Sequence, residues 1–294
     1  MKRLIVNADD FGLSAGVNRA ILEAHIDGIL TSATLLANGA AFEEAVQLAR
    51  ETPQLGVGIH LNLTEGPPIC DPARIPRLVR GDGKFAASPA RLAVRLLSGK
   101  ASLAEVESEW RAQIEKVLAA GLQPMHLDGH KHIHMLPMLF ALAARLAREH
   151  GISGVRCAAE SAGSLGEIFR RGGADSITML KQFFKGRALA AVSTGSRERL
   201  RRMGLRSPDY FFGITQTGLL DTASLERLLE ALPEGTSELM CHPGYADAAL
   251  RATPTRLVEQ RERELTALIS AEARRRVAES GIQLIHYGGL AGTP

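Results

Sequence analysis

Short apolar runs alternate with amphipathic helical patterns along this chain. Residues 4–6 form a β-type run, and the segment after Ser14 repeats apolar residues at helical spacing until Gly28. The same order returns as a strand-like run over 31–38 and a helical pattern over 42–49. The start of the chain therefore predicts two consecutive β-α units.

The middle of the chain continues this order. The stretch GVGIHLNL, residues 56–63, alternates strictly and predicts a third strand with His60 on its polar face. Farther along, Ser102 and Glu105 have the spacing of a capping box, which predicts the start of a helix that buries Leu103.

Four further strand-like runs bring the predicted number of strands to seven. They cover 125–134, 154–158, 237–241 and 282–287, and helical patterns cover 136–151, 222–232 and 255–280. Strands separated by helices predict an α/β fold with parallel strands, either a doubly wound sheet or a barrel. Polar residues gather at the carboxyl ends of the strands, which converge on one mouth in a barrel. We therefore favour a (β/α) TIM-like barrel over the doubly wound sheet.

The composition agrees with one folded domain over residues 1–294. The chain is 45% hydrophobic and 23% charged, with a net charge of +3 that gives no argument for nucleic acid. Three separated cysteines suit a reducing compartment. The pattern contains neither a signal peptide nor a transmembrane segment. We expect a cytoplasmic protein without integral membrane association.

A basic excursion at about 160–221 is the hardest segment to interpret. Residues 170–206 hold ten Lys or Arg against two acids, Asp175 and Glu198. A solvated helical excursion explains this charge. A lid or docking surface for an anionic or membrane-bound substrate explains it as well. The sequence leaves both interpretations open.

The stretch HLDGHKHIH holds the densest group of metal-binding residue types. On an extended backbone, one side of the strand would carry His126, Asp128, His130, His132 and His134. Imidazoles with a carboxylate suit Zn²⁺ or a Mg²⁺-like ion, and positions left open to water are typical of a catalytic site. The residues by themselves favour a mononuclear metal hydrolase.

Four motifs, in this order, resemble the YdjC-like family, which includes chito-oligosaccharide and hopanoid-pathway deacetylases. They are NADDFG, GIHLNLTEG, HLDGHKHIHMLP and MCHPGY, and the resemblance runs from Lys2 nearly to the C-terminus. Gly129 and Lys131 depart from the family pattern, where Ser and a second His often stand. The resemblance implies a distorted seven-stranded barrel that removes an acetyl group from an N-acetylated amino sugar with one divalent metal ion per chain, Mg²⁺ or Zn²⁺.

Carried over residue by residue, the resemblance implies that Asp10, His60 and His130 bind the metal. Asp9 matches the catalytic base that takes a proton from water, and His242 matches the late histidine that protonates the departing amine. Adjacent residues on an extended strand point to opposite faces, so different roles for the two aspartates agree with the backbone.

Four more residues are expected around this centre. Asp128, His132 and His134 are expected to orient the metal ligands or to contact the substrate. Arg156 has two interpretations of equal weight: it orients Asp9 or a substrate hydroxyl, or it is a surface residue at the end of a strand.

Two other classes of protein stay open. A metal-dependent phosphoesterase on a barrel also uses Asp and His, although such sites often hold two or three metals. A non-enzymatic protein could dock on nucleic acid or an anionic membrane through residues 170–206. The expected partner is an N-acetylated saccharide or glycoconjugate and not nucleic acid, and a homo-oligomer is compatible with the sequence. The motifs do not specify the sugar.

Overall fold

The computed structural model describes residues 1–85, 88–160 and 173–292. In this part of the chain, eight strands form one sheet in which every pairing is parallel. The strands are β1 (Lys2–Phe11), β2 (Ser32–Leu35), β3 (Gly56–Leu61), β4 (His126–Gly129), β5 (Gly154–Val155), β6 (Tyr210–Phe212), β7 (Gly235–Cys241) and β8 (Gln283–Leu284).

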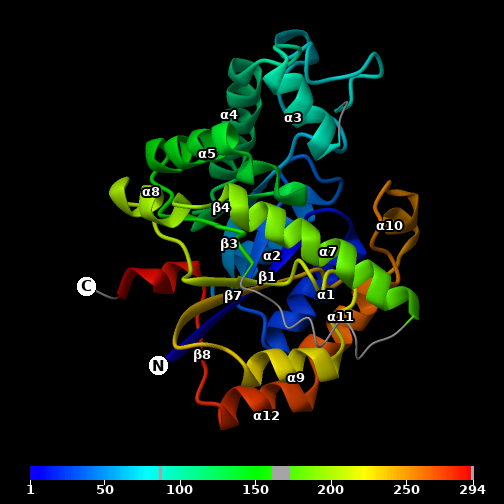
Figure 1. The fold of residues 1–294 in the computed structure, drawn as a ribbon. Coiled ribbons are helices and arrows are strands. Elements are labelled where there is room, and N and C mark those ends of the chain that lie inside the picture. Colours follow the sequence, from blue (N-terminus) through cyan, green and yellow to red (C-terminus); the bar gives the residue numbers. More distant parts are fainter. Residues whose placement is uncertain (86–87, 161–172, 293–294) are drawn as a thin grey trace.

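Helices connect most of these strands and lie around the sheet (Figure 1). The α-helices are α1 (Ala15–Ile26), α2 (Phe42–Glu51), α3 (Pro89–Leu97), α4 (Leu103–Ala119), α5 (Pro137–Glu149), α7 (Gly173–Val192), α8 (Ser196–Arg202), α9 (Thr222–Glu230), α10 (Ala248–Ala252), α11 (Gln260–Leu268) and α12 (Ala271–Glu279). The short 3-10 helices are η1 (Pro72–Arg74), η2 (His130–Met135) and η3 (Tyr287–Gly292).

The sheet curls into an incompletely closed barrel. Seven strands follow the order β5-β4-β3-β2-β1-β7-β6, and β8 pairs beside β1. Single parallel bridges, Gly154 with Arg206 and Glu160 with Phe211, link the two edges of this path. The expected seven-stranded α/β barrel is confirmed, although β6 was not predicted and the predicted strand at 282–287 is the short β8, outside the seven-strand path.

The turn after β1 is built by local chemistry. Ser14 has an extended backbone, and its hydroxyl accepts a hydrogen bond from the Val17 N–H at 3.2 Å, which caps α1. The apolar face of α1 is buried, including Val17 and Ile21. This packing fixes the end of β1, where the two adjacent aspartates stand.

Two expectations for α4 are wrong. The helix begins at Leu103, but the Ser102 side chain makes no capping hydrogen bond, and Glu105 accepts instead from the Arg77 N–H at 2.9 Å. Leu103 is 40% exposed. Burial of Val106, Trp110 and four further positions along one face holds the helix without the capping box.

The basic excursion divides into two helices with different surroundings. α7 contributes Lys181 and Lys185 to the wall of the main pocket. In α8, Arg201 and Arg202 face solvent and pair with Glu198. Residues 161–172 of the excursion lie outside the described residues. None of the helices in the described part of the chain is long and apolar enough to cross a membrane.

Candidate active site

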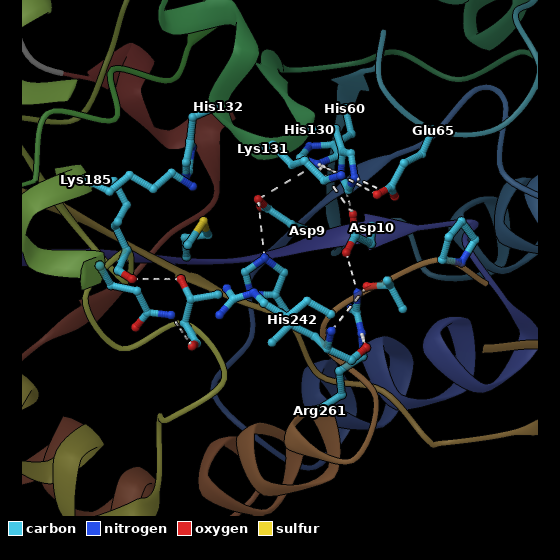
Figure 2. A pocket seen from close by; sticks show the side chains of 18 of the residues that line it. Asp9, Asp10, His60, Glu65, His130, Lys131, His132, Lys185, His242 and Arg261 are labelled. Carbon is cyan, nitrogen blue, oxygen red and sulfur yellow. Dashed lines mark hydrogen bonds and ion pairs between the residues drawn. The ribbon is translucent and has the colours of Figure 1, made fainter. Parts of the chain in front are cut away.

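The carboxyl end of β1 turns two adjacent aspartates toward the same pocket (Figure 2). Ala8 pairs with Ala33 while Phe11 pairs with Leu35, so β1 has one extra residue between these pairs. Asp10 has a φ of 70°, in the left-handed region that side chains rarely adopt. A regular strand would send Asp9 and Asp10 to opposite faces, and the bulge brings both carboxylates into one site.

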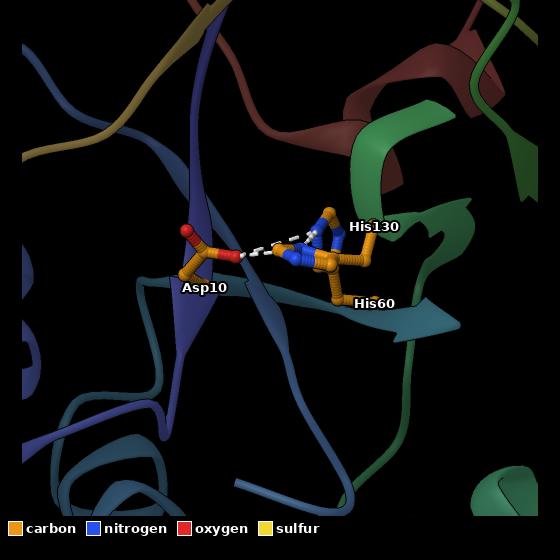
Figure 3. A group of neighbouring side chains, drawn as sticks. All are labelled: Asp10, His60 and His130. Atoms are coloured by element: carbon orange, nitrogen blue, oxygen red, sulfur yellow. Dashed lines mark hydrogen bonds and ion pairs between the residues drawn. The ribbon is translucent and has the colours of Figure 1, made fainter. Parts of the chain in front are cut away.

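Asp10 forms a tight cluster with two histidines (Figure 3). Its Oδ1 lies 3.1 Å from His130 Nδ1 and 3.6 Å from His60 Nε2. The two histidine nitrogens are 3.3 Å apart. Three potential ligand atoms, from β1, β3 and η2, therefore converge on one point.

Each member of this cluster is held from behind by an oppositely charged or hydrogen-bonding partner. Arg261 Nη2 donates to Asp10 Oδ2 at 2.6 Å, His60 Nδ1 to Asp128 Oδ1 at 2.6 Å, and His130 Nε2 to Glu65 Oε2 at 3.0 Å. In the neutral form of each histidine, the carboxylate that accepts from one ring nitrogen leaves the lone pair of the other nitrogen directed at the cluster. The ligand set is oriented before any ion enters.

The donor set fits a single divalent cation. Asp10 Oδ1 is buried and accepts no hydrogen bond of good geometry, although two imidazoles stand beside it. A second group in the described chain, Asp9, His60 and Asp128, also has metal-binding residue types. There the guanidinium of Arg156 already occupies the space between the two carboxylates. The first cluster therefore fits a metal, and the second does not.

Arg156 fixes the carboxylate of Asp9 through hydrogen bonds from both of its terminal nitrogens. Arg156 Nη1 and Nη2 donate to Asp9 Oδ2 and Oδ1 at 2.9 and 2.8 Å, and Asn7 Nδ2 donates at 3.1 Å. Burial alone would raise the pKa of Asp9, but Arg156 and then His60 outweigh it and hold the pKa well below 3.8. Asp9 is therefore an ionised carboxylate with a fixed orientation.

Arg156 itself is fully buried, so its interpretation as a surface residue is wrong. It contacts three carboxylates: Asp9, Asp128 at 2.5 Å and Glu238 at 2.8 Å. Burial raises the pKa of Glu238 to about 6, because Arg156 offsets only part of the desolvation. One guanidinium thus organises the buried acids below the pocket.

His242 lies across the pocket from the cluster. Its Nε2 is 4.0 Å from Asp9 Oδ2, and its backbone N–H donates to Glu264 Oε2 at 2.6 Å. Burial lowers the pKa of His242 to about 4, and its Nδ1 has no hydrogen-bond partner. His242 is thus a neutral imidazole that can gain a proton when negative charge develops nearby.

The histidine-rich stretch does not run as one extended strand. β4 ends at Gly129, and Lys131 and His132 both have positive φ, 56° and 59°. The expectation that five side chains share one side is therefore wrong. Their positions differ: His126 stacks on Tyr287, Asp128 holds His60, His130 joins the cluster, His132 lines the pocket, and His134 Nε2 bonds the Arg156 carbonyl at 3.1 Å.

The pocket above these groups measures about 480 Å³. The acidic and histidine side chains form one part of its lining, and Lys185 reaches in from α7 toward His132 (Figure 2). The Lys131 ammonium pairs with Glu65. Apolar side chains, among them Ile214, Met240 and Leu257, share the lining with these charged and polar groups.

Several residues of the site were missed at the level of sequence. Glu65 follows β3 in the motif LNLTEG, and its place after a strand was a usable signal. Arg261 and Glu264 lie on α11, far along the chain, and no local pattern indicates their role. Glu238 and Tyr287 looked like ordinary strand residues.

Fold and pocket together define a (β/α)-barrel protein with an Asp-His-His cluster at the carboxyl ends of its parallel strands. The family model described as YdjC-like protein matches residues 3–279. The chain therefore belongs to the YdjC-like family.

Similar proteins cover nearly the whole chain. A carbohydrate deacetylase of Geobacillus stearothermophilus is 34% identical over 285 residues, 96% of each chain. A chitooligosaccharide deacetylase of Salmonella paratyphi B is 34% identical over 282 residues, 95% of each chain. A crystal structure from Enterococcus faecalis V583, for which cellobiose-phosphate cleavage has been suggested, is 30% identical with a TM-score of 0.75 and 99% coverage of both chains.

Proposed function

We propose that this chain is a metal-dependent carbohydrate N-deacetylase, acting as a single barrel domain on an N-acetylated amino sugar of the chito-oligosaccharide type. The products are acetate and a free amine. The observation that carries the proposal is one pocket holding an Asp-His-His cluster, a carboxylate fixed by arginine and a neutral histidine. The names of the full-length relatives support the same chemistry.

Asp10, His60 and His130 would hold one divalent ion, and two imidazoles with one carboxylate suit Zn²⁺ or Mg²⁺. When bound, such an ion supplies Lewis acidity to the acetyl carbonyl and makes water more acidic. Asp128, Glu65 and the other partners behind the cluster keep the ligand atoms aimed inward.

The remaining steps belong to the side chains across the pocket. Asp9 accepts a proton as the water oxygen bonds to the acetyl carbon, and Arg156 keeps its carboxylate turned to the pocket. His242 then supplies a proton to the nitrogen as the carbon–nitrogen bond breaks. Its low pKa leaves it neutral before the reaction, so the proton that it supplies is the one that Asp9 took from water, passed from Asp9 Oδ2 to His242 Nε2 across 4.0 Å.

Acetate release from a panel of N-acetylated sugars tests the proposal. We expect release that chelation abolishes and that added Zn²⁺ or Mg²⁺ restores, with one bound ion per chain. Full activity in rigorously metal-free protein would contradict the mechanism. Inactivity on every N-acetylated sugar, with the metal bound, would contradict the substrate class.

The two alternatives meet specific obstacles. A phosphoesterase with two metals would need the second acidic group, whose centre Arg156 fills. A docking protein would rely on the exposed arginines of α8, two of which pair with Glu198. Two bound ions per chain would favour the phosphoesterase. Binding to nucleic acid or an anionic membrane that depends steeply on salt and is unchanged by substitution of Asp9 would favour the docking protein.

A further inference from the structure

Tyr287 is a fully buried residue at the start of η3, near the C-terminus. Its hydroxyl donates to Glu238 Oε2 at 2.5 Å, although 49 residues separate the two in sequence. It lies beyond residues 3–279, which the family model matches. The C-terminal segment thus reaches the buried acids below the pocket.

Tyr287 stands at one end of a continuous series of hydrogen bonds that leads to Asp9. Glu238 accepts from Tyr287 on Oε2 and from Arg156 Nε on Oε1, the latter at 2.8 Å. Arg156 in turn presents Nη1 and Nη2 to Asp9. Tyr287 and Arg156 therefore bind different oxygens of Glu238, and Glu238 and Asp9 bind different nitrogens of Arg156.

The surroundings of Tyr287 fix its hydroxyl in place. Its ring stacks on His126 with centroids 3.6 Å apart and planes 4° from parallel. A Cβ added at Gly154 would lie 2.9 Å from Tyr287 Cδ1, and one at Gly58 would lie 2.3 Å from His126 Cε1. Burial and Glu238 raise the pKa of Tyr287 well above 10, so the hydroxyl keeps its proton and donates.

We propose that Tyr287 is a positioning residue for the base Asp9, acting through Glu238 and Arg156. Arg156 serves three buried carboxylates, and these compete for the same five N–H donors. Tyr287 donates to one oxygen of Glu238, and this keeps the Glu238 carboxylate beside Nε of Arg156. The two terminal nitrogens of Arg156, Nη1 and Nη2, then stay available to Asp9. This inference rests on the proposed deacetylase reaction.

Tyr287→Phe removes the hydroxyl and keeps the ring stack. We expect kcat for acetate release to fall about tenfold, with KM and metal content close to wild type. The melting temperature should fall by only a few degrees, because Glu238 Oε2 loses its donor. Tyr245→Phe is the matched control, because Tyr245 also donates to a glutamate, Glu23, on the outside of the barrel. Glu238→Gln tests the contact between Glu238 and Arg156 and leaves the stacked rings of Tyr287 and His126 intact. It should likewise lower kcat and leave KM unchanged.

A double variant distinguishes positioning from a general structural role. In an Asp9→Asn background, assayed at raised enzyme concentration, Tyr287→Phe should cause no further loss, since its effect passes through Asp9. A second tenfold loss there would overturn the inference, as would a wild-type kcat in the single variant. If wild-type protein releases no acetate from any N-acetylated sugar, the proposed function itself fails, and that result is separate from the other two.

Discussion

Exchanging each of the adjacent aspartates for asparagine is the sharpest test of the site. Asp9→Asn should keep its metal and lose turnover, because the amide cannot accept the proton that a carboxylate takes. Loss of a general base costs about 10²- to 10⁴-fold in rate, or about 3 to 5 kcal/mol of transition-state stabilisation. Folding should tolerate the change, since Arg156 retains Asp128 and Glu238.

Asp10→Asn should instead lose the metal. Arg261 Nη2 lies 2.6 Å from Asp10 Oδ2 and is buried, so it requires an acceptor. The single carbonyl oxygen of asparagine will turn to Arg261, which leaves its NH₂ group facing the two imidazoles. A donor at that place repels a cation, and metal affinity should fall at least as far as in His60→Ala or His130→Ala.

The assay is metal content by plasma mass spectrometry beside steady-state acetate release, for each variant shown to be folded by its melting curve. The roles are reversed if Asp9→Asn is metal-free while Asp10→Asn binds metal and fails only in turnover. Wild-type activity in both variants would mean that the bulge at the end of β1 is purely structural.

Three further predictions concern the surroundings of the site. Serine in place of the exposed α8 arginines, Arg199, Arg201 and Arg202, should leave turnover of a small soluble substrate within a few-fold, because no residue of α8 lines the pocket; complete inactivity in a folded variant would disprove this. Metal-free protein should lose stability, by at most about 3 kcal/mol, as pH rises from 6.5 to about 9. Burial lowers the pKa of His130, but two neighbouring carboxylates outweigh burial and raise it to about 9, so the stabilising charged form is complete below 6.5 and gone above 9. Melting curves across this range, with a flatter slope in His130→Gln, check it. Gly58→Ala should cost about 1 to 3 kcal/mol in urea unfolding, because the new methyl meets the ring of His126; unchanged stability would show that this ring can move aside.

Local pattern predicted the parts of the site that follow strands. Asp10 and His60 stand on or at the ends of strands whose apolar pattern is clear, and parallel strands bring such ends together. The same reasoning failed for the histidine-rich stretch. Left-handed backbone at Lys131 and His132 ends the extended geometry, and nothing in the composition of HKHIH requires that conformation.

The sequence alone did not predict contacts between residues that lie far apart along the chain. Arg261 meets Asp10 from a helix 251 residues later, and its own neighbourhood looks like a solvated charged helix. β6 escaped notice because Tyr210–Phe212 is only three residues long, too short to show alternation. In both cases the information lies in the packing of distant elements.

The order of the site along the chain has a consequence for synthesis. The three residues of the Asp-His-His cluster come from positions 10 to 130, and β1, β2, β3 and β4 that support them are neighbours in the sheet. His242, Arg261 and Tyr287 come from the last fifth of the chain. At ribosomal speeds, roughly 5 to 20 seconds separate the synthesis of His130 from that of His242. A nascent chain can therefore gather its metal-binding residues and the base Asp9 before His242 exists, so an ion captured early would meet a site that still lacks the group that protonates the departing amine.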